Sequence, residues 1–163
     1  MRRNGFSVIE LLVAVLIIGI IAAIALGNYM NAIQRAKQKR TMADIRAVAT
    51  AWEARAVDTR QYNAAAYTMP TATLTYDDIA TMLIPTYVRT TSRTDGWGHP
   101  LDFRVDQALG SSAAAALYAI RSPGREGVYQ GDTYNGGPTT EFDCDIVYSG
   151  GQFIAWPEGV QGK

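Results

Sequence analysis

The sequence predicts an α+β fold in which a long N-terminal helix, membrane-spanning in its first half, packs on a small C-terminal antiparallel β-sheet. Three observations support this prediction: an almost unbroken apolar run near the start, an amphipathic stretch without proline after it, and short alternating segments separated by turns in the second half. The 163 residues leave room for one domain beside a membrane or targeting segment.

A membrane-spanning helix is predicted first. Every residue from 11 to 26 is apolar or glycine, and further apolar residues precede this run: Phe6, Val8 and Ile9. Together they reach the roughly 20 residues that a span needs. Glu10 interrupts them, although a charge costs roughly 2.5–3.5 kcal/mol at the centre of a membrane helix and less near its end. A function that offsets this cost is therefore expected of Glu10.

A secretory signal peptide is the ordinary alternative for such a segment. Arg2 and Arg3 would form its charged start, and residues 23–25 its small-residue cleavage site. Two features count against it: Glu10 stands where the apolar region of a signal peptide should begin, and the helical pattern does not stop at residue 25.

The pattern continues instead as an amphipathic stem over residues 28–60. Apolar side chains recur there with a 3.6-residue period, at Ile45, Val48, Ala49, Trp52 and Ala56. No proline occurs before Pro70, so one helix can run from about residue 6 into the high fifties. Its length would be roughly 75–80 Å at 1.5 Å per residue.

The segment GFSVIELL at positions 5–12 resembles the processing motif of the type IV pilin superfamily, which includes the pseudopilins of type II secretion. The resemblance implies that a prepilin peptidase cuts after Gly5 and that Phe6 becomes the N-methylated first residue. It also implies four parts: a prepilin leader (1–5), a transmembrane assembly helix (6–27), the stem (28–60) and a C-terminal α+β periplasmic domain (61–163).

This cut would give Glu10 a partner. It would create an α-amino cation at Phe6, one helical turn from the carboxylate. In a stack of such helices, the amine of one subunit can pair with Glu10 of its neighbour, which would fix axial register more than it adds stability. We therefore predict an assembly role for Glu10; a carboxylate that snorkels to the membrane edge is the alternative.

Charge is balanced overall but uneven along the chain. The net charge of zero indicates neither a nucleic acid nor an acidic partner. Residues 28–60 hold seven basic and three acidic side chains, whereas residues 122–145 hold one basic and five acidic. Four basic residues soon after the span outnumber two before it, which by the positive-inside rule would leave the domain in the cytoplasm. The processing motif takes precedence, because the leader is cut on the cytoplasmic side in the family that it resembles.

The second half predicts one short helix and several strands. Thr75 and Asp78 form a capping pattern for a helix that ends before Pro85. Residues 60–73 are predicted to form a loop and 94–100 a turn. Strands are predicted over 101–106 and 115–121, and Gly150-Gly151 predicts a hairpin between 145–149 and 152–156.

Two segments of this half resemble the major pseudopilin of type II secretion. DGWGHP at 95–100 is similar to its D-x-W-G-x-P turn, and SPGREG at 122–127 to its S-x-G-x-D-G segment, with glutamate in place of aspartate. The resemblance implies a bound calcium ion, with candidate ligands at Ser122, Glu126, Asp132, Asp143 and Asp145. Calcium takes six to eight oxygen ligands, and a long loop without periodicity needs something to organise it. A solvated acidic loop is the alternative.

No catalytic constellation appears in the sequence, so an enzyme is not predicted. Cys144 is the single cysteine, which excludes an intrachain disulfide, and we expect structural roles for Cys144 and His99.

Three functions stay open. The first is a pseudopilin in the bacterial inner membrane, with copies of itself, minor pseudopilins, the prepilin peptidase, an inner-membrane assembly platform and exoproteins as partners. The second is a type IV pilin of a surface fibre for adhesion or motility. Such pilins often close a C-terminal loop with a disulfide, so the single cysteine favours the first. The third is a membrane-anchored calcium-binding module that does not polymerise.

Overall fold

The computed structural model describes residues 6–59, 70–107 and 115–162. The chain divides into two units, Met1–Arg35 and Ala36–Lys163. The predicted leader and residues 60–69 of the predicted loop lie outside the described residues.

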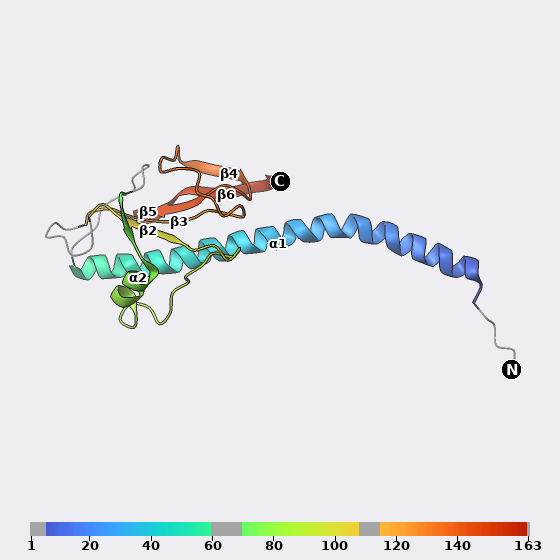
Figure 1. The fold of residues 1–163 in the computed structure, drawn as a ribbon, viewed down its shortest axis with the longest axis horizontal. Helices are drawn as coiled ribbons and strands as arrows, with labels where there is room; N and C mark the ends of the chain where they lie inside the picture. The colour runs from blue at the N-terminus through green and yellow to red at the C-terminus, as the bar shows by residue number, and fades with distance from the viewer. Residues whose placement is uncertain (1–5, 60–69, 108–114, 163) are drawn as a thin grey trace. The chain divides into compact units, whose positions relative to one another are not determined.

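The first unit holds the N-terminal part of helix α1 (Val8–Thr59), drawn in blue in Figure 1. Its apolar side chains are exposed, for example Phe6 at 79% and Leu16 at 62%. The helix is long and apolar enough to cross a membrane, and none of its most apolar stretch is buried. The prediction of one helix from about residue 6 into the high fifties is confirmed.

In the second unit, the rest of α1 packs against helix α2 (Tyr76–Leu83) and a six-stranded sheet. The stripe predicted from helical spacing is the buried face of α1: Ile45, Val48, Ala49, Trp52 and Ala56 are all at most 6% exposed. Helix α2 is confirmed together with its capping box, because Thr75 and Asp78 bond each other's backbone N–H groups. The core therefore lies between α1, α2 and one face of the sheet.

The sheet has the strand order β1-β2-β3-β5-β6-β4. Its strands are β1 (Ala72–Leu74), β2 (Asp102–Val105), β3 (Tyr118–Ser122), β4 (Gly137–Glu141), β5 (Ile146–Ser149) and β6 (Gln152–Gly162). Strands β2 and β3 and the β5–β6 hairpin confirm the predicted strands, and the α+β class is confirmed. The wholly antiparallel pairing is wrong in one place, because β4 pairs with β6 in parallel.

The two edge strands overturn loop predictions: β1 begins inside the predicted loop 60–73, and β4 lies in the segment expected to be a long loop. Strand β1 has only three residues, too few for an alternating pattern to be read. Strand β4 contains Gly137 and Pro138, residue types that are depleted in strands. An edge position tolerates proline, because one side of an edge strand needs no ladder hydrogen bond.

The turn at 94–100 joins the sheet to the stem. The backbone N–H of Gly96 donates to Thr41 Oγ1 at 2.8 Å. A Cβ at Gly96 would lie 2.4 Å from the carbonyl oxygen of Lys37, so only glycine allows this approach. The same turn also accepts a hydrogen bond from Ser122, where the segment described below begins.

Candidate functional site

The first candidate residue, Glu10, lies in the first turn of α1. Its Oε2 accepts a hydrogen bond from the backbone N–H of Ser7 at 2.9 Å. This is one half of a capping box, in which an acid at the third helical position satisfies an N–H that the helix leaves free. Sequence analysis missed this bond, although the S-x-x-E spacing of Ser7 and Glu10 could have indicated it. The Ser7 N–H would survive a cut between Gly5 and Phe6.

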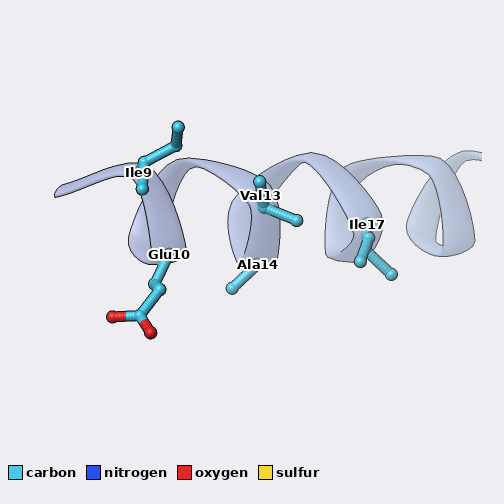
Figure 2. A pocket seen from close by; sticks show the side chains of 5 residues that line it. All are labelled: Ile9, Glu10, Val13, Ala14 and Ile17. Atoms are coloured by element: carbon cyan, nitrogen blue, oxygen red, sulfur yellow. The ribbon is translucent and has the colours of Figure 1, made fainter. Parts of the chain in front are cut away.

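A shallow recess lies beside this carboxylate (Figure 2), lined by Ile9, Glu10, Val13, Ala14 and Ile17. Figure 2 shows Glu10 and Ala14 projecting from the same side of the helix. The small side chain of Ala14, one turn after Glu10, leaves room next to the carboxylate. Because the surrounding side chains are apolar and exposed, the recess suits the side of another apolar helix.

The remaining candidates of this region are Gly5 and Phe6. Gly5 lies outside the described residues, and Phe6 immediately precedes the helix with an exposed ring. Leader cleavage, N-methylation and the assembly role of Glu10 stay predictions.

The segment 122–145 starts from a polar anchor. Ser122 is fully buried, and its hydroxyl donates to Asp95 Oδ2 at 2.8 Å. The other oxygen of Asp95 accepts from the backbone N–H groups of Trp97 and His99, both at 2.9 Å. His99 Nδ1 lies 3.0 Å from the carbonyl oxygen of Gly124. Ser122 and the 94–100 turn therefore form one hydrogen-bonded unit.

Arginine side chains meet two of the predicted calcium ligands. The guanidinium of Arg125 donates to both oxygens of Asp143, at 2.7 Å each. This pairing lowers the pKa of Asp143. Asp132 lies 3.1 Å from Arg121 and 3.6 Å from Arg104. Both carboxylates thus already face positive charge from the same chain.

Asp145 is held by neutral donors. It is 1% exposed, and its Oδ2 accepts from the Tyr134 hydroxyl at 2.6 Å and from the backbone N–H of Gln130 at 3.0 Å. Its Oδ1 is buried, and no hydrogen-bond partner for it lies among the described residues. Burial raises the pKa of Asp145, because it disfavours the charged form.

The described residues do not fit a calcium ion as they are placed. Asp132 and Asp143 pair with arginines, Ser122 bonds Asp95, and Glu126 is exposed. Among the described ranges, no three histidine, cysteine, aspartate or glutamate side chains lie close enough to hold a metal. The unpartnered Oδ1 of Asp145 is the one observation in favour of a cation. The calcium site stays a prediction.

Backbone contacts close the two ends of this segment. The N–H of Arg125 donates to the carbonyl oxygen of Phe142 at 2.9 Å. Gly124 adopts a φ of 66°, and a Cβ there would lie 2.6 Å from the carbonyl oxygen of Cys144. Cys144 itself is half-buried, and burial raises the pKa of its thiol. Sequence analysis did not find Arg121 and Arg125, since their spacing to the acids becomes visible only in the fold.

Comparison with known proteins bears on the first region. Residues 1–26 match the family model for the prokaryotic N-terminal methylation motif. The chain is 41% identical over 59 residues to the type IV major fimbrial protein FimA of Dichelobacter nodosus, and 44% over 50 residues to the type IV major pilin protein PilA of Myxococcus xanthus. It is 31% identical over 61 residues to the type II secretion system core protein G of Aeromonas hydrophila.

These matches cover 36%, 31% and 37% of this chain. They cover 38%, 23% and 43% of the relatives, so the chain spans less than half the length of each of them. No solved structure matches. The predicted resemblance to the type IV pilin superfamily is confirmed, and the relatives are pilus or secretion-system proteins rather than enzymes by name.

Proposed function

Because the chain carries a prepilin-type methylation motif and an exposed apolar helix, we propose that it is the structural subunit of a pseudopilus. It polymerises through its N-terminal helix and drives protein export in type II secretion. The observation that supports this best is the position of the Glu10 carboxylate. It lies in the first turn of an apolar helix, beside a shallow recess that could receive the side of another apolar helix. An uncompensated acid there would cost membrane insertion energy.

The proposal includes a location and a set of partners. The helix anchors the chain once in the inner membrane, with the second unit in the periplasm. The prepilin peptidase cuts after Gly5, copies of the chain stack through their helices, and minor pseudopilins and an inner-membrane platform complete the assembly. The resemblance of residues 95–100 and 122–127 to the major pseudopilin supports this choice.

A type IV pilin of a surface fibre is the second candidate, and two kinds of relatives favour it: the fimbrial protein and the major pilin. In both candidates the chain is a filament subunit. They differ in what the filament does, so a strain that lacks the protein separates them. Loss of exoprotein secretion with unchanged surface motility supports the pseudopilin, and the reverse result supports the pilin.

Processing provides the most direct test of the shared part. We expect the intact mass of the protein from native membranes to correspond to a chain that begins at methylated Phe6. Gly5→Trp should leave the precursor uncut and abolish filaments seen by electron microscopy. Arg89→Met, an exposed position in the second unit, is the control variant and should be cut and assembled normally. An uncut native chain, or one cut near Ala25, would contradict the proposal.

A further inference from the structure

The stem presents basic side chains that no described acid neutralises. Lys39 and Arg46 are exposed and lie seven residues apart, which places them on the same face of α1 two turns from each other. Neither forms an ion pair with a described acid, whereas Arg40 next to them lies 3.6 Å from Asp44. The Cζ of the Arg46 guanidinium lies 5.3 Å from the centre of the Phe153 ring, and a guanidinium over a ring can still donate hydrogen bonds from its edge.

Segment 122–145 presents negative charge, opposite to that of the stem. Glu126 and Glu141 are exposed, and neither forms an ion pair with a described basic group. The hydrogen bond from the Arg125 N–H to the Phe142 carbonyl brings the two stretches that carry them side by side. Arg125 does not neutralise them, because Asp143 takes up its guanidinium. Two exposed negative charges without a described ion-pair partner therefore lie on neighbouring stretches, with Glu141 at the end of edge strand β4.

We propose that a second copy of this chain docks its Glu126 and Glu141 onto Lys39 and Arg46 of the first. This inference rests on the proposed self-assembly and names the surfaces that meet. The two surfaces differ, so the contact is heterologous, and a heterologous contact that does not close generates a helical filament. A single exposed ion pair contributes little, so this contact sets the register of copies that their apolar helices hold together.

Charge reversal in the full-length protein, expressed in its native membrane, tests the contact. Lys39→Glu with Arg46→Glu should lower the filament yield about tenfold, because two attractions become repulsions. Glu126→Lys with Glu141→Lys should lower it by a similar factor. The variant that carries all four changes should regain most of the yield. Arg89→Glu and Asp77→Lys, which change exposed charges elsewhere, are the matched controls and should assemble normally.

A direct readout accompanies the yield. In a Cys144→Ser background, cells that contain both Lys39→Cys and Glu126→Cys copies should form disulfide-linked dimers upon oxidation. Cells with Arg89→Cys and Glu126→Cys should not. Membrane level and processed fraction, measured for each variant, show whether a loss of filaments comes from misfolding.

The outcomes are distinguishable. Normal filaments from either reversed pair, or no recovery in the fourfold variant with no dimers, would overturn the proposed contact while the proposed function stands. Loss of filaments from the stem variant alone, with weaker flotation on phosphatidylglycerol vesicles, would overturn it in favour of an anionic membrane surface. Absence of filaments from the unmodified chain would overturn the proposed function itself, and the contact with it.

Discussion

The two units of the chain treat their acidic side chains in opposite ways. Glu10 in the first unit lies among exposed apolar residues, and the described bond to it comes from a backbone N–H. The acids of segment 122–145 lie in the second unit. Asp132 and Asp143 form ion pairs with arginines there, and Asp145 accepts hydrogen bonds from a tyrosine and a backbone N–H. An unfilled carboxylate on an apolar helix is what the proposed assembly role of Glu10 requires, whereas contacts within the second unit hold most acids of the segment.

The largest effect on filament yield is expected from removing the Glu10 carboxylate, which tests the first half of this comparison. Glu10→Ala should lower filament yield by more than about tenfold, because a buried pair that loses one partner costs about 3–5 kcal/mol. The melting temperature of the detergent-solubilised chain should not change, since no packed side chain of the second unit is altered. Electron microscopy and thermal unfolding measure the two effects. Normal filaments from this variant would show that Glu10 only snorkels.

Arg121 should show the reverse behaviour. Its side chain is 3% exposed and donates to Asp102 at 2.8 Å and to the Tyr134 hydroxyl at 2.9 Å. Arg121→Met leaves Asp102 with less compensation, so we expect a loss of about 3–5 kcal/mol in the free energy of unfolding. Chemical denaturation measures it.

Two control variants give smaller expected losses of stability than Arg121→Met. Arg125→Met should cost only about 0.5–1 kcal/mol, because its ion pair with Asp143 is partly exposed and screened by solvent. Arg89→Met, on an exposed arginine, should stay within about 0.5 kcal/mol of the unmodified chain. Equal losses from all three variants would contradict the role given to burial.

Local patterns predicted much of this molecule. The 3.6-residue spacing identified the buried face of α1, the capping pair Thr75 and Asp78 identified α2, and Gly150-Gly151 identified the β5–β6 hairpin. Each of these signals lies within a few neighbouring residues. The apolar run likewise indicated a helix of membrane-spanning length, which the structure has.

The partners of the acids were beyond sequence reasoning for a physical reason. Asp143 meets Arg125 across 18 positions, and Asp132 meets Arg104 across an even longer stretch. Such pairs depend on the register of the sheet and on the contact that Gly124 permits. A count of charges could identify an acidic segment, but it could not tell arginine pairing from metal binding.

A smaller effect is the dependence of stability on pH, which should differ between Asp145 and Asp143. The pKa of Asp145 is raised by burial, so the folded chain binds this proton more tightly than the unfolded chain. Its contribution to stability is present below the ordinary carboxyl value of about 4 and is lost as pH rises through the folded pKa. Relative to Asp145→Asn, the unmodified chain should therefore lose stability as pH rises above about 4. Denaturation at several pH values measures this slope.

Asp143 should behave in the opposite sense. Arg125 lowers its pKa, so its contribution is present above about pH 4 and is lost as pH falls through the folded value. Asp143→Asn should therefore change stability mainly in acid. A common pH profile for the two variants would contradict the environments that the structure assigns to them.

The smallest expected effect concerns calcium. A ligand that binds only the folded chain adds about 2.7 kcal/mol of stability at a hundredfold excess over its dissociation constant. Here calcium would first have to displace Arg125 from Asp143, and Arg104 and Arg121 would repel it from Asp132. We therefore expect the full chain in detergent to melt within about 1–2 °C in calcium and in chelator, a shift well below that of a saturated site. A larger rise in calcium, lost in Asp145→Asn and unchanged in the control Asp77→Asn, would instead confirm the metal site that the sequence predicts. The buried Oδ1 of Asp145 would then be a ligand, and the arginine pairs would describe the segment without its ion.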